Sequence, residues 1–587
     1  MAVTNEEISE LFEDMASLLE MKGDVIFKIR AYQRAARTIS QLPQSLELAV
    51  RQEQELKKIP GIGDAISKKI YEYVTTGHVA AYERLKADLP DGVLTLMNVP
   101  GIGPKTAMLI AKETGASTVE GVEKAIHQGR LQELPGLGER AAENILRHIH
   151  SLRTKDQRTP LGQALPIVER IIADLRERCP TLKKATPAGS VRRWQETVGD
   201  IDIMGTAQDP VQVIDALVDL SYVREVLVHG PKKASVVVDP GLQVDLRIVE
   251  DDSFGAMVQY FTGNQQHNVR LRDYANRMGL SLNEYGITNL KTGQMEKFAD
   301  EEGFYDRLGL QMPPPEIRQG LWELDLAQKH ALPRLVEQDD IRGDLHMHSD
   351  WSDGREPIEA MMEAASQFGH QYVALTDHSS GRGIANGLSD ERLQSQIKIL
   401  RTLQGFSVKI LCGSEVDIRA DGSLDYPDEL LADLDVVVAS VHSAMGQPVE
   451  KMTERIIKAM HNPHVTVIGH PTARLLGSRD PVEVDMEALL QAALETGTAM
   501  EINSSPERLD LKDTHVLRAR ELGVPLVIST DSHSSGYLDK LRFGVAVARR
   551  GWCEPKHIVN TMPLEEFMAF IKAPKSERIH IFAGRVD

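Results

Sequence analysis

Apolar residues recur at helical spacing in the N-terminal part of the chain. Over Asn5–Glu20 they fall on one face of a helix, which predicts an amphipathic segment. These apolar positions are Ile8, Leu11, Phe12, Met15, Leu18 and Leu19. Helix-like segments continue to about residue 160, so the pattern predicts an α-helical N-terminal region.

The period of the pattern shortens after this region. Leu165–Cys179 still predicts an amphipathic helix, but the apolar runs that follow are short and alternate with polar residues, as half-buried strands do. The predicted strands are 185–206, which contains a turn, and then 222–228, 234–238 and 242–249. Together they predict a small mixed sheet in an α/β domain.

A third pattern of apolar and polar positions begins near residue 341. Short apolar runs, each followed by a polar residue of a metal-binding type, alternate with helical stretches. The runs are 341–345, 372–376, 408–413, 435–441, 465–469, 498–500 and 526–530. Seven strands that alternate with helices and end in polar residues predict a parallel β/α barrel with its site at the carboxyl ends of the strands.

The composition is that of an ordinary folded protein. Of the 587 residues, 42% are hydrophobic and 26% are charged, and no uncharged apolar run long enough to span a membrane occurs. The first residues lack the basic and apolar stretches of a secretory signal, and the three cysteines lie far apart. We therefore expect a cytoplasmic, multidomain protein without disulfides. The net charge of -19 does not exclude binding to nucleic acid, which needs only a local positive stripe.

Three aspartates on predicted strands form the first candidate site. Asp200 and Asp202 lie two residues apart in an apolar run, so their carboxylates face the same side of a strand. Asp245 lies in the alternating strand 242–249. Such carboxylates repel one another unless cations lie between them, and hard oxygen ligands suit Mg²⁺ or Mn²⁺ together with a substrate's phosphates. The alternative is a pair of acids that keeps a sheet edge solvated.

The residues upstream of the aspartates favour a site that handles phosphates. Gly189 and Ser190 offer close backbone approach and a hydroxyl, and Arg192 and Arg193 add fixed positive charge. The whole string resembles the palm of the X-family DNA polymerases, in the nucleotidyltransferase superfamily. By this resemblance the first two aspartates would bridge two cations that hold a triphosphate, and the third would help place the cation that activates the primer 3′-hydroxyl.

The resemblance continues beyond the sheet. Tyr260-Phe261-Thr262-Gly263 is similar to the family's thumb, where the Tyr-Phe corner lies against the nucleotide sugar. Asn268 would then meet the edge of the incoming base, and Arg272 the template strand. The implied nucleotide-binding residues are Gly189, Ser190, Arg193, Gly199, Tyr260, Phe261, Gly263, Asn268 and Arg272.

A turn of one type occurs three times in the N-terminal region, as Pro60-Gly61-Ile62-Gly63, Pro100-Gly101-Ile102-Gly103 and Pro135-Gly136-Leu137-Gly138. Its glycines permit a tight hairpin and leave bare backbone N–H groups at a helix N-terminus, which bind phosphate without sequence preference. The three turns resemble helix-hairpin-helix motifs. In the family the first two also hold a monovalent cation, Na⁺ or K⁺, through main-chain carbonyls. The corresponding carbonyls here belong to Lys57, Ile59, Ile62, Met97, Val99 and Ile102.

The segment 27–37 interleaves cations with aromatic residues, a pattern that holds phosphates while stacking on bases, although a solvated helix face is the alternative. The predicted DNA-binding residues are Lys28, Tyr32, Gly61, Gly63, Gly101, Gly103 and Lys105. Lys69 aligns with the Schiff-base lysine of the family's lyase helix, which implies attack on a ribose aldehyde. Simple contact of Lys69 with a 5′-phosphate is the alternative, and Phe27 replaces a polar residue of the family's phosphate site.

Nine side chains of metal-binding type follow the predicted barrel strands. They are His346, His348, Asp353, His378, Glu415, His442, His470, Asp531 and His533. Mixed imidazole and carboxylate ligands suit Zn²⁺, Mn²⁺ or Fe²⁺, and nine are enough for up to three ions, with Glu415 as a bridge. The set resembles the polymerase-and-histidinol-phosphatase (PHP) domain, in which metal-activated water attacks a phosphate ester. Arg382, Arg419 and Arg474 are candidate phosphate clamps, with salt bridges as the alternative.

These resemblances cover nearly the whole chain, which is similar to bacterial X-family DNA polymerases with a C-terminal PHP domain. The implied fold is multidomain: an α-helical helix-hairpin-helix region, an α/β nucleotidyltransferase palm with a thumb, and a distorted (β/α)7-type barrel. The predicted domains are 1–85 (lyase-like), 86–160 (fingers), 161–252 (palm), 253–318 (thumb), 319–340 (linker) and 341–580 (PHP).

The function implied is the filling of short gaps during DNA repair, with 3′–5′ exonuclease or abasic-site endonuclease activity in the barrel. The expected partners are gapped or primer-template DNA and deoxynucleoside triphosphates, bound by a monomer that does not contact a membrane. Two alternatives stay open. The barrel could instead be a phosphatase for small molecules, or the chain could be a non-enzymatic scaffold for DNA ends, against which the complete aspartate set argues.

Overall fold

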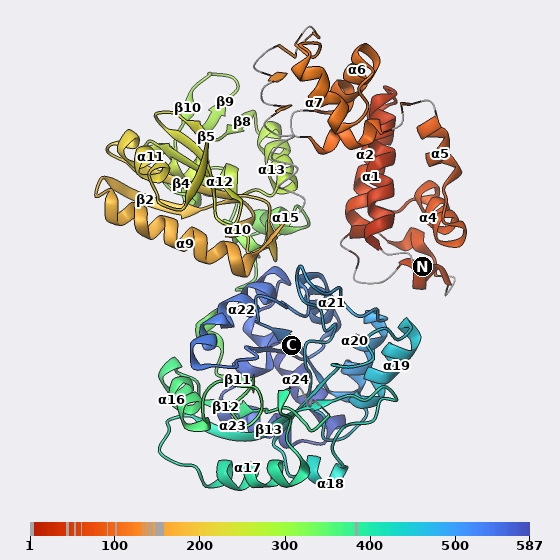
Figure 1. Ribbon diagram of the computed structural model, residues 1–587, viewed down its shortest axis with the longest axis vertical. Coiled ribbons are helices and arrows are strands. Elements are labelled where there is room, and N and C mark those ends of the chain that lie inside the picture. Colours follow the sequence, from red (N-terminus) through yellow and green to blue (C-terminus); the bar gives the residue numbers. More distant parts are fainter. Residues whose placement is uncertain are drawn as a thin grey trace. The chain divides into compact units, whose positions relative to one another are not determined.

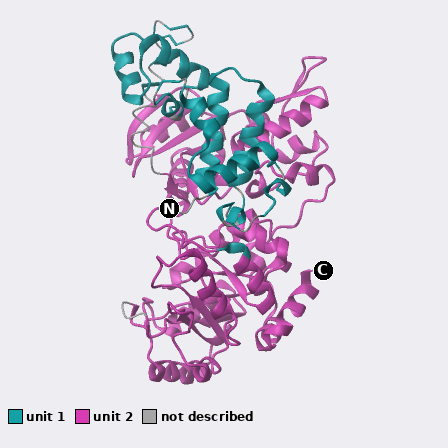
Figure 2. Ribbon diagram, turned by 90° about the vertical axis from the view of Figure 1, so that its right-hand side faces the viewer, with its two compact units in different colours: residues 1–157, 485–487 teal, residues 158–484, 488–587 magenta. Residues whose placement is uncertain are grey.

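The computed structural model describes residues 5–40, 42, 46–51, 54–59, 61–87, 89–90, 92–99, 102–132, 134–135, 137–138, 141–142, 145–146, 158–381 and 385–586. The chain forms two compact units, coloured separately in Figure 2. The first contains residues 1–157 with 485–487, and the second contains residues 158–484 and 488–587. No described helix is both long enough and apolar enough to cross a membrane.

The first unit is built from helices, as the apolar spacing predicts. They are α1 Asn5–Met21, α2 Ile26–Ser40, α3 Leu46–Arg51, α4 Asp64–Thr76, α5 Ala80–Ala87, α6 Pro104–Thr114 and α7 Val119–His127, with 3-10 turns η1 Leu56–Lys58 and η2 Val93–Asn98. The apolar face of α1 is buried, and the ring of Phe12 lies 5.9 Å from that of Tyr32 on α2. Gly63 and Gly103 are the N-caps of α4 and α6, so the first two hairpin turns each open a helix.

The predicted mixed sheet forms the start of the second unit. Its strands are β2 Leu182–Pro187, β4 Ile201–Ala207, β5 Val223–His229, β6 Lys233–Val238 and β7 Leu242–Val249, in the order β2-β4-β7-β6-β5. A short pair, β1 Thr159–Pro160 with β3 Thr197–Val198, lies beside it, and the helices of this part are α9 Leu161–Arg178, α10 Gly189–Arg192 and α11 Pro210–Val218. Helix α9 begins earlier than predicted because Leu161 and Ala164 continue its buried face.

The next segment is a helical subdomain with a small antiparallel sheet. Its elements are α12 Phe254–Thr262, α13 Gln265–Arg277, β8 Leu280–Asn283, β9 Gly286–Asn289, β10 Met295–Glu296 and α14 Glu301–Asp306. The residues predicted as a linker also fold, into α15 Glu323–Gln328 and the 3-10 turn η5 Gln338–Asp340. Trp322 packs 5.3 Å from Trp552, and Leu335 is buried, so apolar side chains tie this segment to the rest of the unit.

Seven parallel strands form the barrel, and they follow one another in sequence order. They are β11 Gly343–Met347, β12 Tyr372–Leu375, β13 Lys409–Asp417, β14 Val436–Ser440, β15 Val467–Ile468, β16 Ala499–Asn503 and β17 Leu526–Ser529. A bridge from Met347 to Ser532, with a 2.8 Å hydrogen bond from His348 N to Ser532 O, joins the first strand to the chain after the last. The predicted distorted (β/α)7-type barrel is therefore confirmed.

Helices lie around the outside of these strands (Figure 1). They are α16 Ile358–Phe368, α17 Asp390–Thr402, α18 Asp428–Leu431, α19 Val449–Met460, α20 Met486–Thr496, α21 Asp513–Leu522 and α22 Leu541–Arg550. The last two helices, α23 Leu564–Lys572 and α24 Lys575–Val586, share a buried apolar cluster with residues of the strands. Phe567 of α23 stacks on Tyr372 of β12 with ring centroids 4.3 Å apart, and the Tyr372 hydroxyl donates to Met562 O at 2.9 Å. Aromatic packing of this kind holds the last helices against the strands.

Candidate active sites

The three predicted aspartates meet on the mixed sheet. Strands β4 and β7 run parallel, and their register places Asp202 opposite Asp245, with Asp200 immediately before β4. Asp245 is held by the Ser235 hydroxyl, which donates to its Oδ1, and by Gln243 Nε2 at 3.0 Å. Strand alternation had predicted a shared face for Asp200 and Asp202, with Asp245 on another strand as the third candidate.

The electrostatics of this cluster fit a cation site. Burial, together with the neighbouring charges of Asp200 and Asp245, raises the pKa of Asp202 to about 7. A carboxylate whose ionised form is unfavourable gains stability from a bound cation, and the ligand atoms are hard oxygens. The residues present therefore fit a divalent ion of the Mg²⁺ or Mn²⁺ type.

The turn before β4 brings the backbone close to Asp202. Gly189 has a φ of 57°, and a Cβ atom on it would lie only 2.8 Å from Asp202 Oδ2. Ala188 N donates to Asp202 O at 2.8 Å, which fixes the turn to the strand. Ser190 lies in the short helix α10 that follows. The glycine is needed here for both its backbone conformation and its missing side chain.

The predicted arginine reaches from this turn to the helical subdomain. Arg193 Nη1 donates to Thr262 O, next to Gly263, and the Arg193 Nε is buried without a partner among the described residues. Burial and the neighbouring Arg550 lower the pKa of Arg193 to about 10, so it stays cationic at neutral pH. Gly199 lies just before the aspartates, where a Cβ would meet only Arg158. The guanidinium is thus held at the edge of the aspartate cluster.

Helices α12 and α13 carry the other predicted nucleotide contacts. Tyr260 and Phe261 pack edge to face with ring centroids 5.2 Å apart. Asn268 Nδ2 donates to Tyr260 O at 2.7 Å, and Asn268 Oδ1 accepts from Gln259 Nε2 at 2.9 Å. Arg272 is exposed one turn further along α13, with its Nε on Asn268 O at 3.3 Å. These four side chains lie close together. Their predicted contacts with the nucleotide and the template stay predictions.

In the first hairpin turn, the structure shows why Gly61 must be glycine. Gly61 has a φ of 93°, and a Cβ on it would lie 2.7 Å from the Thr38 hydroxyl. Pro60, Pro100, Gly101 and Gly136 lie outside the described residues, so the predicted role of Gly101 is not tested. Lys105 is exposed in the first turn of α6.

Two of the proposed cation-binding carbonyls already accept hydrogen bonds within the turns. Ile59 O accepts from Ile62 N at 3.0 Å, and Val99 O accepts from Ile102 N at 2.9 Å. The carbonyls of Lys57 and Met97 belong to η1 and η2, immediately before each turn. The described residues of the two turns therefore form equivalent hydrogen bonds, and binding of Na⁺ or K⁺ stays a prediction.

Lys69 lies on α4 beside α2. Its Nζ donates to Ala65 O at 3.1 Å and lies 5.7 Å from the ring centroid of Tyr32. Lys28 pairs instead with Asp24 at 2.6 Å, and the neighbouring Phe27 is 83% exposed. Lys69 and Tyr32 thus share one face of the first unit.

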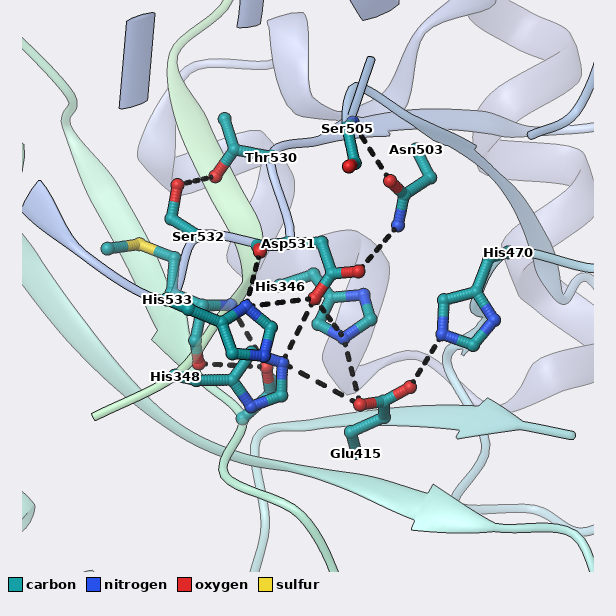
Figure 3. A network of polar contacts seen from close by, with 12 residues as sticks. His346, His348, Glu415, His470, Asn503, Ser505, Thr530, Asp531, Ser532 and His533 are labelled. Atoms are coloured by element: carbon teal, nitrogen blue, oxygen red, sulfur yellow. Dashed lines mark hydrogen bonds and ion pairs between the residues drawn. The ribbon is translucent and has the colours of Figure 1, made fainter. Parts of the chain in front are cut away.

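All nine predicted barrel ligands converge on one buried nest, part of which appears in Figure 3. Three groups of side chains within it bring their ligand atoms within 4.8 Å of one another. They are His348, Asp353, His378 and His533; His346, His348 and Glu415; and His378, Glu415 and His442. Because these groups share members, the nest has the form of a multinuclear metal centre.

Glu415 is at the middle of the nest. Its Oε2 lies 2.9 Å from His378 Nδ1 and 3.3 Å from His346 Nε2, and its Oε1 lies 2.9 Å from His470 Nε2 and 3.1 Å from His442 Nε2. Strand β13 runs four residues beyond its predicted end, so Glu415 lies within the strand. A carboxylate with both oxygens surrounded by imidazoles is suited to bridge two cations.

The donor atoms of the nest fit metal ions. Ring nitrogens of His346, His348, His378 and His470 are buried and lack hydrogen-bond partners among the described residues. Burial opposes the charge of His378, but Glu415 and Asp353 outweigh it and raise the pKa of His378 to about 10. Burial and the charge of His533 lower the pKa of His348 to about 4. The carboxylates therefore favour positive charge in the nest, and an imidazole that stays neutral, such as that of His348, can bind a metal ion.

Three residues that support the nest were missed from the sequence. Glu501 Oε1 lies 2.8 Å from His346 Nδ1, and its Oε2 accepts from His470 N at 2.6 Å. Asp417 Oδ1 lies 2.6 Å from His442 Nδ1. Arg508 Nε lies 3.5 Å from Asp531 Oδ2. Glu501 follows a predicted strand directly, which is the signal that could have identified it.

Of the three arginines suggested as phosphate clamps, the two that the structure describes, Arg419 and Arg474, are bound to partners other than the nine ligands. Arg419 pairs with Asp425 at 3.0 Å, and Arg474 pairs with Glu196 at 2.8 Å while donating to the carbonyls of Arg508 and Leu509. Arg382 lies outside the described residues. Arg419 and Arg474 therefore form salt bridges, which was the alternative prediction for them.

Comparison with protein families gives four matches along the chain. Residues 3–79 match a helix-hairpin-helix domain and residues 93–151 a SAM-like helix-hairpin-helix tandem. Residues 257–319 match the DNA polymerase beta thumb, and residues 344–505 match the PHP domain. The families follow the order in which the sequence motifs occur.

Individual relatives give the same picture. The chain is 38% identical over 96% of its length to DNA polymerase/3′-5′ exonuclease PolX of Bacillus subtilis, of which it covers 99%. It is 25% identical over 54% of its length to DNA polymerase lambda of Arabidopsis thaliana, of which it covers 62%. A probable phosphatase of Thermoanaerobacter is 31% identical over 33% of the chain, and 79% of that protein is covered.

Proposed function

The chain belongs to the PolX family of X-family DNA polymerases with a C-terminal PHP domain, and from this premise we propose how its two sites divide the work. It is a DNA polymerase with a 3′–5′ exonuclease. We assign synthesis to the aspartate cluster on β4 and β7 and hydrolysis to the nest in the barrel. The observation that carries this assignment is the presence of two separate sets of cation ligands, one of oxygens alone and one of imidazoles with carboxylates.

In synthesis, the primer 3′-oxygen attacks the α-phosphorus of a deoxynucleoside triphosphate, and pyrophosphate leaves. Asp200, Asp202 and Asp245 would hold divalent ions, whose charge offsets that of the phosphates and favours ionisation of the primer hydroxyl. Arg193, at the edge of the cluster, would bind triphosphate oxygens together with the backbone of Gly189 and the hydroxyl of Ser190.

The side chains of α12 and α13 would position the nucleotide. The rings of Tyr260 and Phe261 would lie against the sugar, Asn268 would meet the base edge and Arg272 the template. This proposal is supported by their proximity and by the match of residues 257–319 to the polymerase beta thumb. The predicted contacts of Gly199 and Gly263 belong to the same proposal.

In hydrolysis, the barrel would cut phosphodiesters at a 3′ end. The nine ligands would hold up to three ions of the Zn²⁺, Mn²⁺ or Fe²⁺ type, which activate water and hold phosphate oxygens when bound. Glu415 would bridge two of the positions, and Glu501 would fix His346 by accepting its Nδ1–H. Incision at abasic sites would use the same centre.

The helix-hairpin-helix turns would hold gapped DNA by its backbone, with Lys28, Tyr32 and Lys105 adding contacts. We propose short-gap filling in DNA repair as the task that combines these parts. Lys69 would contact a 5′-phosphate or act as the lyase nucleophile, and the exposed Phe27 beside Lys28 is an apolar residue where the lyase resemblance expects a polar one.

The decisive experiment compares two variants on one substrate. With a gapped duplex, triphosphates and Mg²⁺ or Mn²⁺, Asp202→Ala is expected to abolish primer extension and leave degradation intact. His346→Ala is expected to do the reverse. Products are followed on a sequencing gel, and circular dichroism checks that both variants fold. Loss of both reactions from either change would overturn the division into independent sites.

A second candidate for the barrel is phosphatase action on small molecules, favoured by the 31% identity to a probable phosphatase. The test compares release of inorganic phosphate from p-nitrophenyl phosphate with release of nucleotides from single-stranded DNA. The exonuclease assignment expects DNA to be the far better substrate, with both reactions lost in His346→Ala. Faster turnover of the monoester would favour the phosphatase.

A further inference from the structure

A cationic edge beside the metal nest is not explained by the nine ligands. Arg508, on the loop after β16, places its Nε 3.5 Å from Asp531 Oδ2. The Oδ1 of the same aspartate faces the imidazoles, at 3.2 Å from His348 Nε2 and 3.7 Å from His346 Nε2. One carboxylate therefore separates the guanidinium from the ligand atoms.

The guanidinium of Arg508 is poorly satisfied by the protein. Its Nη1 is buried and has no hydrogen-bond partner in the part of the chain that the structure describes. Asp531 Oδ2 is also shared, because it accepts from Asn503 Nδ2 at 3.1 Å, as Figure 3 shows. A buried donor without a partner costs free energy unless a ligand fills it. Cations bound in the nest would repel this guanidinium, and a phosphate bound between them would offset that repulsion.

The loop holds Arg508 firmly in this position. Arg474 donates to the carbonyls of Arg508, at 2.9 Å, and of Leu509. Arg508 N donates to Ser505 O at 2.8 Å, and Leu509 adopts a φ of 47°, which a branched side chain rarely does. Backbone strain that is held by side-chain bonds is typical of functional positions.

A second cation lies at the same edge. Lys540 ends the 3-10 turn η7, Ser535–Lys540, and its Nζ lies 3.4 Å from the ring centroid of Tyr537. The turn that carries Lys540 starts beside the nest, because its N-cap Ser534 follows the ligand His533 directly and accepts from Tyr537 N at 2.9 Å. Among the described residues Lys540 forms no ion pair with a carboxylate. Arg355, 5.9 Å from the same ring, donates its backbone N–H to the ligand His533 at 2.8 Å.

We propose that Arg508 and Lys540 form the phosphate-binding edge of the nuclease centre, with Arg508 on the scissile phosphodiester and Lys540 on the adjacent nucleotide against Tyr537. This rests on the assignment of DNA hydrolysis to the barrel. The guanidinium Nη1 would donate to a non-bridging oxygen, whose negative charge grows as water adds to phosphorus and the 3′-oxygen leaves. The ring of Tyr537 would offer a stacking surface for the base.

The test separates phosphate binding from support of the metal centre. Hydrolysis of single-stranded DNA is measured for the metal-loaded full chain, with deoxythymidine 5′-monophosphate as a competing product and metal content read by mass spectrometry. Arg508→Ala is expected to raise the inhibition constant of the monophosphate about 10- to 100-fold with unchanged metal content. Lys540→Ala is expected to raise it about threefold to tenfold. Arg508→Lys should recover part of the loss, and primer extension should not change.

Matched controls come from the outer helix α17, where Arg401→Ala and Lys398→Ala remove the same charges away from the nest. These variants should behave as the wild type does. An unchanged inhibition constant in Arg508→Ala would overturn the proposal. Loss of metal from that variant would also overturn it, because Arg508 would then only orient Asp531. If His346→Ala still degrades DNA, the failure lies instead in the assignment of hydrolysis to the barrel.

Discussion

Gly189 brings the backbone close to Asp202 in the proposed synthesis site. Its φ of 57° strains any other L-residue, and a Cβ would lie 2.8 Å from Asp202 Oδ2. Gly189→Ala is therefore expected to displace the aspartate and lower primer extension about 100-fold, since small misplacements in an active site are costly. Extension and degradation are measured on the same gapped duplex, and degradation should not change.

Gly241 offers the matched control for this substitution. It also has a positive φ, of 117°, in the turn between β6 and β7, but a Cβ there would meet nothing within 4 Å. Gly241→Ala carries backbone strain without a clash, so it should extend primers normally. Equal loss in both variants would show that strain in the sheet, and not the approach to Asp202, limits activity.

Glu501 shows what a residue outside the ligand set contributes. It accepts from His346 Nδ1 at 2.8 Å and from His470 N at 2.6 Å, so it fixes two ligands at once. Glu501→Gln keeps the shape but removes the charge that holds the His346 ring. Metal affinity of the barrel, measured by competition with a chelating dye, is expected to fall about 10- to 100-fold. Glu495→Gln on the outer helix α20 makes the same chemical change and should not alter metal affinity. If Glu501→Gln bound metal as tightly as Glu495→Gln does, Glu501 would have no role in holding the ligands.

Site residues on regular strands could be predicted from the sequence, whereas those on loops could not. His346 and His348 share a face because strands alternate, so their convergence was predictable. Arg508 lies on a loop five residues beyond β16, where neither strand nor helix period fixes the direction of a side chain. Arg474 had the right charge, but its partner Glu196 lies 278 residues away in sequence. Ligands on regular elements could be predicted, and partners on loops could not.

At the scale of elements, the pattern gave the order of helices and strands but not all of their ends. Strand β13 continues through Ser414 and Glu415 because its neighbour β14 pairs with it as far as Asp417, and polar residues inside a barrel hide such continuation. The segment 319–340 has a linker's composition, yet Trp322 and Leu335 anchor it. Contacts with distant residues decided both cases, strand pairing in the first and burial in the second.

The docking of helix α24 depends on a lysine that is largely withdrawn from water. Lys575 Nζ donates to Thr498 Oγ1 at 2.8 Å and to Met460 O. Burial, with the charge of Arg578, lowers the pKa of Lys575 to about 7. Between this value and the ordinary lysine pKa of about 10.4 the unfolded chain binds more protons than the folded one, so the free energy of unfolding rises with pH across that window.

Urea unfolding at pH 7, 8 and 9 tests this dependence. The wild type should gain stability with pH relative to Lys575→Met, which cannot titrate. Lys572→Met, on the exposed side of α23, serves as the control and should follow the wild type. Parallel pH profiles for Lys575→Met and the wild type would show that burial of Lys575 has no influence on the barrel.

At the scale of the whole molecule, the second unit joins its polymerase part to the barrel through the loop that follows Arg193. Arg550 donates to Arg193 O at 3.2 Å, Arg474 pairs with Glu196, and the ring of Trp194 packs edge to face on Phe543 at 5.6 Å. Arg193, which is proposed to bind the triphosphate, is thus in direct contact with Arg550 of the barrel. Parts of a chain that are held by buried contacts unfold together, and a ligand of one then stabilises both.

Removal of the barrel metals should therefore weaken the polymerase part as well. In scanning calorimetry of the wild type, a chelator is expected to lower the whole transition of the second unit. In Trp194→Ala it should lower mainly the barrel's transition, because loss of the edge-to-face contact with Phe543, which contributes about 0.5 to 1.5 kcal/mol, weakens the link between the two parts. Tyr285→Ala, at a half-exposed ring on the helical subdomain, is the control and should unfold as the wild type does. If the chelator left the unfolding temperature of the wild-type polymerase part unchanged, these contacts would join the two parts without coupling their stability.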